Sequence, residues 1–291
     1  MKKRILSALA LFLGLIIFCM TSCSRSKNDS TFSIEFMDVG QGDAALVECD
    51  GQYMLIDGGP KSAGETVYSV LEEKGIQHLN ILAISHMHED HIGGLPKALT
   101  YASKIDKTIA NTNHVSEDKD SFIKLEYALG VDGASITVPH TGDTYPLGSA
   151  KVEVIDVASI DDNDSLVLMI TYGKTRFLFT GDIEDEAQGR ISDKYANQKN
   201  KLYKVNVLKM PHHGSANPNS VNGTGSLYRF IETFMPDYTI ISVGAGNRYG
   251  HPYKETLDLL KQARTKVYRT DQNGTITVKS NGKTVSVTGS K

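Results

Sequence analysis

The stretch NILAISHMHEDHIGG, residues 80–94, limits the folds open to this chain more than any other. Its apolar first part predicts a short strand that is buried on both faces and is therefore covered on each side by other elements. Three of the chain's nine histidines follow directly, on the turn where that strand ends. Loops at strand ends carry chemistry on a rigid base, and imidazole with carboxylate suits zinc, manganese or iron. The candidate metal ligands here are His86, His88, Asp90 and His91.

The rest of the chain has the pattern of a mixed α/β domain. Apolar runs of strand length recur in both halves of residues 32–291, and helix-like segments such as residues 62–75 and 183–196 lie between them. Asp50-Gly51 and Asn281-Gly282 predict tight β-hairpins. No linker rich in Pro, Gly or Ser divides this region. We expect one domain with a four-layer αββα sandwich, two sheets packed together with helices outside.

The first 22 residues predict an export signal. A basic start, MKKR, precedes an apolar run that is too short for a membrane span and ends at small residues. Ser22-Cys23 resembles a bacterial lipobox, so we expect Cys23 to be the lipidated first residue of an exported surface lipoprotein, with residues 23–31 as its tether to the membrane. A plain signal peptide and an uncleaved anchor are the alternatives. Of the three cysteines only Cys49 falls in the domain, so no internal disulfide is expected.

Further candidate ligands follow later strand-like runs. Asp182 comes after FLFTG, the pair His212-His213 comes after VNVLKMP, and His251 comes in a loop after TIISVG. Each has an ordinary structural alternative, since Asp182 could cap the helix that begins at Ile183 and His251 could serve a turn. All of them end a strand that runs into a loop, so they can converge at one sheet edge.

These motifs resemble those of a known family. HMHEDH, FTGD and PHHGS are similar to the metal motifs of the metallo-β-lactamase-fold hydrolases. DVGQGDA at 38–44, LIDGG at 55–59, NDSLVL at 163–168 and NRYGHP at 247–252 narrow the likeness to the soluble domain of bacterial competence DNA-uptake (ComEC-like) proteins. The resemblance covers about residues 32–285 and implies the four-layer metallo-β-lactamase fold.

The resemblance implies a site for two metal ions, most simply zinc, with manganese as the alternative. Its ligands would be His86, His88, Asp90, His91, Asp182 and His212. The first two would hold one ion and the next two the other, with Asp182 as the bridge. Strand alternation leaves open which of His212 and His213 is the ligand. We favour His212, with His213 pointing toward substrate.

Neighbouring motif residues would support this site. Asp57 would hold the metal loop from behind, and Asp38 and Asp43 would shape the loop beside it. Asn163 or Asp164 would approach the first metal.

Many relatives place a further histidine on the first metal. Here only His114 and His140 fall in the corresponding interval, and neither stands in a ligand motif. A single-metal site is therefore an alternative.

The implied chemistry is hydrolysis by a hydroxide that two metal ions generate from a shared water. Asp90 or a nearby water is a candidate proton donor to the leaving group, and the loops of His213, Ser215, Asn247 and His251 could contact substrate. A phosphodiester leads as substrate, either DNA or a phosphorylated surface polymer or small molecule. Another metallo-hydrolase of esterase or lactamase type and a non-catalytic metal-binding surface lipoprotein are the alternatives.

The charge of the chain gives DNA no independent support. The net charge is -3, and no dense basic run with interleaved aromatic residues occurs. Lys209, Arg248 and Lys254 are the basic residues near the motifs. The DNA hypothesis therefore rests on the resemblance.

Overall fold

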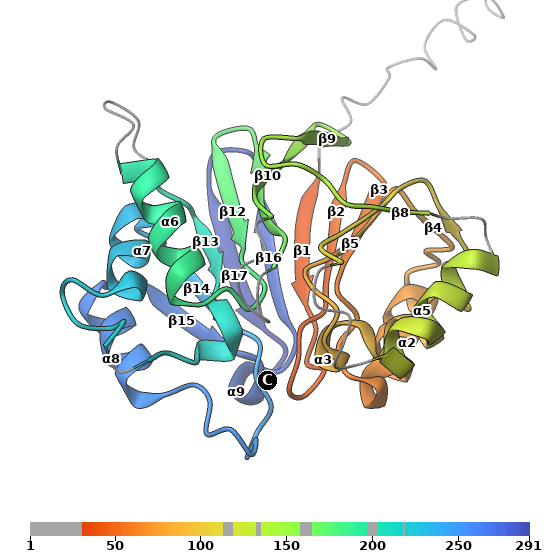
Figure 1. The fold of residues 1–291 in the computed structure, drawn as a ribbon. Helices are drawn as coiled ribbons and strands as arrows, with labels where there is room; N and C mark the ends of the chain where they lie inside the picture. The colour runs from red at the N-terminus through yellow and green to blue at the C-terminus, as the bar shows by residue number, and fades with distance from the viewer. Residues whose placement is uncertain (1–30, 113–118, 132–134, 158–164, 197–202, 218) are drawn as a thin grey trace, which may run out of the picture. The chain divides into compact units, whose positions relative to one another are not determined.

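Two mixed β-sheets pack face to face, and helices cover the outer face of each (Figure 1). The computed structural model describes residues 31–112, 119–131, 135–157, 165–196, 203–217 and 219–291. Residues 31–291 form one compact unit. This arrangement confirms the predicted four-layer αββα sandwich of the metallo-β-lactamase type. Cys23, His114, Asn163 and Asp164 lie outside the described residues, so the roles expected of them stay predictions.

The first sheet has eight strands in the order β17-β16-β1-β2-β3-β5-β7-β8. Their bounds are β1 (Phe32–Phe36), β2 (Ala45–Cys49), β3 (Gln52–Ile56), β5 (Ile81–Ile84), β7 (Thr108–Ala110), β8 (Ile136–Thr137), β16 (Ile276–Ser280) and β17 (Val285–Gly289). Strands β3, β5, β7 and β8 run parallel to one another. A small separate sheet pairs β4 (His78–Leu79) with β6 (Lys104–Ile105).

The second sheet has seven strands in the order β15-β14-β13-β12-β11-β10-β9. Their bounds are β9 (Thr144–Leu147), β10 (Ala150–Asp156), β11 (Val167–Tyr172), β12 (Thr175–Phe179), β13 (Val207–Lys209), β14 (Tyr238–Ile241) and β15 (Lys266–Arg269). Strands β12 to β15 are parallel. Each sheet therefore has a parallel part whose strands end in loops at one edge.

The helices separate into two groups, one on each outer face (Figure 1). The first sheet is covered by α2 (Gly64–Glu73), α3 (Glu89–Ile92), α4 (Leu95–Ala98) and α5 (Lys119–Val131), with η1 (Lys61–Ala63) before α2. The second is covered by α6 (Asp185–Ala196), α7 (Ser226–Phe234) and α8 (Lys254–Gln262). The short α9 (Thr270–Asn273) follows β15, and η2 (Pro211–Gly214) follows β13.

Aromatic rings join the two sheets in the central core. Phe32 of β1 stacks on Phe177 of β12 with ring centres 4.7 Å apart, and Phe36 stacks on Phe179 at 5.4 Å. Stacked pairs of this kind add about 0.5–1.5 kcal/mol to the effect of burial. The apolar faces of both sheets thus fix how the loops at their edges meet.

The hairpin predicted at Asp50-Gly51 is present. Asp50 and Gly51 have φ of 53° and 77°, as the tight hairpin between β2 and β3 requires. Among the described residues, no helix combines the length and apolarity needed to cross a bilayer.

Candidate metal centre

Every candidate ligand in the described residues follows a parallel strand of one of the two sheets. The loop after β5 carries His86 to His91, the turn after β12 carries Asp182, and η2 after β13 carries His213. Gly181 precedes Asp182 with φ of 52°, and a Cβ atom there would lie 2.4 Å from Ser165 Oγ. Only glycine fits this turn. The predicted convergence of strand ends is therefore present.

The centre of the site is a group of two histidines and two aspartates, all buried except the partly exposed Asp90. Asp182 Oδ2 lies 3.2 Å from His91 Nε2 and 3.4 Å from His213 Nε2. Asp90 Oδ2 lies 3.2 Å from His213 Nε2. One ligand atom from each of these four residues lies within 4.8 Å of all the others, a spacing that allows them to hold one metal ion.

His86 and His88 lie at the margin of this group. His86 is buried, and its ring centre lies 4.2 Å from that of His91. His86 Nε2 lies 3.0 Å from His88 Nδ1. His88 Nε2 is buried and has no hydrogen-bond partner among the described residues, as expected of an atom placed for a ligand. The structure thus brings all three histidines of HMHEDH together.

The structure exchanges the expected positions of His212 and His213. The buried residue at Asp90 and Asp182 is His213, whereas His212 is partly exposed and its Nδ1 lies 2.8 Å from Glu184 Oε1. The cause is the backbone, since both histidines have left-handed φ values of 45° and 53°. Side-chain alternation along a strand therefore does not continue into η2. The structure thus brings His213, and not the favoured His212, into the group of ligand atoms, and we carry the predicted ligand role forward to His213.

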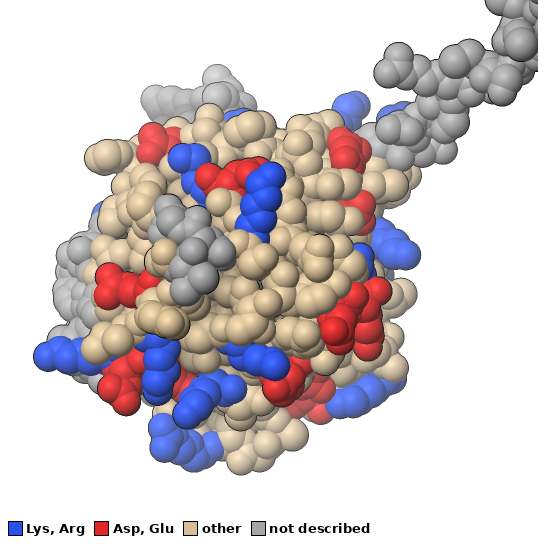
Figure 2. Space-filling model, turned by 90° about the vertical axis from the view of Figure 1, so that its right-hand side faces the viewer, with Lys and Arg blue, Asp and Glu red and all other residues tan. Residues whose placement is uncertain are grey.

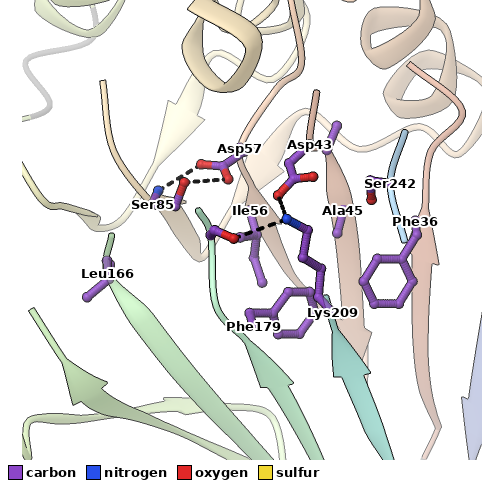
Figure 3. A pocket seen from close by; sticks show the side chains of 12 residues that line it. Phe36, Asp43, Ala45, Ile56, Asp57, Ser85, Leu166, Phe179, Lys209 and Ser242 are labelled. Carbon is purple, nitrogen blue, oxygen red and sulfur yellow. Dashed lines mark hydrogen bonds and ion pairs between the residues drawn. The ribbon is translucent and has the colours of Figure 1, made fainter. Parts of the chain in front are cut away.

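Asp57 supports the site in the way expected. It is buried at the end of β3, and its carboxylate accepts hydrogen bonds from Ser85 N at 2.7 Å and Ser85 Oγ at 2.8 Å (Figure 3). Its Oδ2 also lies 2.9 Å from His91 Nδ1. A carboxylate that holds one ring nitrogen orients the other toward a metal, so Asp57 aims His91 Nε2 at Asp182.

Lys209 is a part of the site that the sequence reasoning missed. We grouped it with basic residues near the motifs, but it is 3% exposed and so does not belong to a nucleic-acid-binding surface. Its ammonium forms an ion pair with Asp43 and donates to the Gly181 carbonyl at 3.2 Å (Figure 3). Its Nζ also lies 3.7 Å from Asp182 Oδ1. The sequence signal for a buried, paired lysine is its place at the end of an apolar run that forms a strand.

Charge compensation within the cluster shifts the titration of its members. Burial alone would lower the pKa of His91 and His213, but the carboxylates beside them, Asp182 above all, raise both pKa values well above the usual range. Burial would likewise raise the pKa of Asp182, yet these two histidines hold it well below its ordinary value. When no ion is bound, the protonated imidazoles of His91 and His213 thus supply the positive charge that offsets the carboxylates.

Asp90 does not suit the role of proton donor. Burial raises its pKa, but His91 and the hydrogen bond from His213 outweigh burial and lower it below the ordinary value. The carboxylate is therefore ionised at neutral pH and carries no proton to donate. The lowered pKa does not favour the expected general-acid role of Asp90, which stays a prediction, while its position among the ligand atoms agrees with the other expected role.

The residues present fit a divalent ion. Neutral imidazole nitrogens and carboxylate oxygens are the donors that zinc and manganese accept. The orphaned His88 Nε2 and the four-residue group of ligand atoms provide such donors in a buried setting. A metal bound there would release the protons that His91 and His213 hold.

Other predicted site residues shape the surroundings. Asn247 holds the loop of residues 247–251, because its side chain donates to His251 O at 2.7 Å and accepts from His251 N at 3.0 Å. The His251 ring centre lies 5.6 Å from that of His212, and Ser215 lies just after the two adjacent histidines.

Asp38, a predicted loop-shaping residue, and His140, for which no ligand role was predicted, lie apart from the ligand group. Asp38 pairs with Lys291 at 2.9 Å instead of contacting a ligand. His140 is exposed beside Asp143, so it does not supply the further histidine that many relatives have.

A pocket opens beside His212. It has a volume of about 430 Å³ and is lined by Ile183, Glu184, Asp185, Gln188, His212, Ser215, Ala216, Asn217 and Tyr253. On the loop of residues 247–251, the Arg248 guanidinium lies 4.9 Å from the centre of the Tyr249 ring, and Tyr249 stacks against His251. Tyr249 is 47% exposed, so this loop presents an aromatic ring and a cation at the edge of the site.

The two packed sheets and the histidine–aspartate site at their edge define a metallo-β-lactamase-type protein. The chain belongs to the metallo-beta-lactamase superfamily, whose sequence pattern matches residues 37–220. The crystal structure of the metallo-beta-lactamase fold protein YhfI from Bacillus subtilis has a TM-score of 0.54 to this chain, at 14% identity. The aligned region covers 86% of this chain and 100% of YhfI. At 14% identity this likeness shows the fold alone.

Among characterised proteins the chain is similar to competence proteins. It is 32% identical to ComE operon protein 3 of Bacillus subtilis (strain 168), over 94% of this chain and 36% of that protein. It is 26% identical to Competence protein ComA of Neisseria gonorrhoeae, over 84% of this chain and 32% of that protein. The chain thus spans about a third of the length of these relatives. These findings confirm the suspected ComEC-like resemblance.

Proposed function

We propose that this domain is a metal-dependent phosphodiesterase that acts on nucleic acid. The observation that carries the proposal is the group of Asp90, His91, Asp182 and His213 at the sheet edge, in which all but Asp90 are buried. It lies beside a loop that presents Arg248 and Tyr249. The likeness to competence proteins favours DNA over other phosphodiesters.

The ligand residues would bind zinc or manganese, with His213 in the place first expected of His212. A bound divalent ion supplies Lewis-acid activation of a phosphoryl oxygen and of a water. Asp57 contributes by fixing the His91 ring, and Asp90 and Asp182 contribute ionised oxygens. His86 and His88 offer donors for a second ion.

His212 takes the role of proton donor to the leaving oxygen. Its Nδ1 contacts Glu184 Oε1 at 2.8 Å, which leaves Nε2 facing the site, 3.9 Å from Asp182 Oδ2. A histidine that a carboxylate orients at the mouth of a pocket is a common general acid. The pocket of about 430 Å³ beside it would receive the leaving group.

Arg248 and Tyr249 would bind the strand next to the scissile phosphate. A guanidinium attracts the backbone phosphate, and an exposed aromatic ring offers a stacking surface to a base. The proposal uses this local feature and not a broad basic surface. On the face shown in Figure 2, basic and acidic side chains are interspersed and no single sign of charge covers it.

Export and lipid anchoring through Cys23 complete the proposal. An exported position would bring the domain to nucleic acid outside the cell membrane. Labelling with a radioactive fatty acid tests it, since the wild-type chain should take up label and Cys23→Ala should not.

The function is tested on the full chain with bis-(p-nitrophenyl) phosphate and with single-stranded oligonucleotides, after loading with zinc or manganese. We expect cleavage of both, and Asp182→Asn should lose activity on both. Tyr249→Ala should raise KM for the oligonucleotide, while Tyr127→Ala, an exposed tyrosine on α5, serves as the matched control. Metal binding without cleavage of any phosphodiester would refute the proposal and favour the non-catalytic metal-binding alternative.

A further inference from the structure

A buried lysine lies beneath the ligand group, although lysine is almost never fully buried unless it is paired. Lys209 ends β13 and reaches Asp43 with its ammonium. It also contacts the Gly181 carbonyl at 3.2 Å and approaches Asp182 Oδ1 to 3.7 Å. Oxygens of two loops, Asp43 in one and Gly181 with Asp182 in the other, thus surround one fixed positive charge. Figure 3 shows the contact of Lys209 with Asp43.

Beside Lys209 lies a second group of residues whose side-chain atoms are close enough together to hold a metal ion. One ligand atom each from Asp43, Asp57 and His91 lies within 4.8 Å of the others, and all three residues are buried. The Lys209 ammonium is paired with Asp43, a member of this group. The cavity that Lys209, Asp43 and Asp57 line measures about 10 Å³, the space of about one water. The ammonium therefore leaves no room for a hydrated metal ion beside it.

We propose that Lys209 is a built-in cation that takes the place of a metal ion in the Asp43–Asp57–His91 group. While the lysine is present, this group remains a supporting layer and metal binds only at the neighbouring ligand group. The inference rests on the proposed metal centre but is independent of its substrate.

Lys209 also gives the two carboxylate oxygens of Asp182 different surroundings. Oδ1 faces the ammonium at 3.7 Å, whereas Oδ2 faces His91 and His213 at 3.2 and 3.4 Å. A fixed charge behind one oxygen favours the orientation that directs the other toward the ligand histidines. Lys209 thus acts as a positioning residue for Asp182.

Charge balance explains why a cation is needed at this depth. Asp43, Asp57 and Asp182 are all nearly inaccessible to solvent, and Asp90 lies beside them. Buried carboxylates require paired charges. A lysine supplies one such charge permanently, whereas metal ions depend on supply and histidines depend on pH.

The test counts bound ions in the full chain. Wild type, Lys209→Ala and Lys209→Ala/Asp43→Asn are equilibrated with zinc or manganese, and metal per chain is measured by elemental mass spectrometry after gel filtration. Alanine is chosen because it leaves space for an ion. Lys204→Ala is the matched control, since Lys204 forms an ion pair with Asp237 at 2.6 Å that is partly exposed.

We expect Lys209→Ala to bind one more ion per chain than wild type. The double variant and Lys204→Ala should bind the wild-type number. An unchanged count in Lys209→Ala, or a gain in the double variant, overturns the proposal. Because the comparison is with wild type, absence of metal from wild type would contradict the proposed function and leave this comparison valid.

Folding supplies a second measurement if Lys209→Ala is unstable. We then expect the variant to regain its β-sheet circular dichroism when zinc or manganese is added, and the double variant to fold in chelator. The contrary result is that the double variant folds in chelator but neither ion restores the fold of Lys209→Ala. A metal then cannot replace the lysine, and the inference is wrong.

Discussion

Replacing Asp57 with asparagine tests how the site sets the proton on His91. The carboxylate accepts hydrogen bonds from Ser85 N at 2.7 Å and faces His91 Nδ1 at 2.9 Å. An ionised carboxylate only accepts, so Nδ1 must carry a proton and Nε2 is free to bind metal. In Asp57→Asn, the amide that keeps the Ser85 N–H bond turns its NH₂ toward Nδ1. His91 would then move its proton to Nε2, the atom that faces Asp182.

The magnitude follows from the number of ligands affected. One ligand of the central group loses its metal-binding tautomer, and loss of such supporting contacts typically lowers metal affinity by about 10- to 100-fold. That range corresponds to about 1.4–2.7 kcal/mol. The backbone should tolerate the change, because Asp57 has φ of 56° and asparagine adopts left-handed φ readily.

Competition with a chromophoric chelator measures the affinity of the full chain for zinc. Asp50→Asn is the matched control, since Asp50 also has left-handed φ, at 53°, and lies in the β2–β3 hairpin away from the ligands. We expect the control to bind zinc as wild type does. Wild-type zinc affinity in Asp57→Asn, with the fold intact by circular dichroism, would refute the assignment of the His91 proton.

Three further predictions concern stability. Gly214→Ala should lower the free energy of unfolding by more than the roughly 1–2 kcal/mol of left-handed strain, because its φ is 82° and its Cβ would lie 2.5 Å from Pro252 Cβ. Gly250→Ala, with φ of 75° and its closest contact at 3.9 Å, should lose only the strain, and equal losses in urea unfolding would contradict this. Burial, with help from His212 and His213, lowers the pKa of His251 from 6.5 to about 4, so the unfolded chain takes up this proton first as pH falls. Stability should therefore fall between about pH 6.5 and 4, and His251→Gln should flatten that fall in chelated protein; an unchanged slope would count against the neutral ring. Removal of metal should lower Tm without unfolding the domain, because protonated His91 and His213 compensate the carboxylates, and an ion at 100 times its dissociation constant contributes about 2.7 kcal/mol. Loss of near-ultraviolet circular dichroism in chelator at room temperature would be the contrary result.

Sequence patterns predicted the layers and the place of the site because both follow from local rules. The apolar run before His86 is a strand buried on both faces, and Asp182 and His213 end other parallel strands, so their convergence follows from sheet geometry. The C-terminal hairpin was also predicted at Asn281. Its pairing with β1 in the first sheet follows from tertiary packing, which no local pattern encodes.

The details that sequence could not provide depend on backbone conformation and on buried charge. Neither His212 nor His213 is a glycine, so nothing in the sequence indicates their left-handed backbone. Sequence alone therefore does not show that His213 is the one that joins the ligand group. The burial of Lys209 is not predicted from sequence because its partners, Asp43 and Asp182, are far from it in the chain. Long-range charge pairs of this kind become visible only in three dimensions.

The cross-sheet origin of the ligands has a mechanical consequence. His91 belongs to the first sheet and Asp182 to the second, 91 positions apart in the chain, yet their side chains are in contact. An ion held by both would act as a reversible cross-link that closes this long segment and opposes separation of the two sheets. In metal-loaded protein, the amides of β5 and β12 should therefore exchange with similar opening free energies, because the two strands open together. After chelation these opening free energies should differ. Metal occupancy at the sheet edge would thus determine whether the two sheets unfold as one cooperative unit.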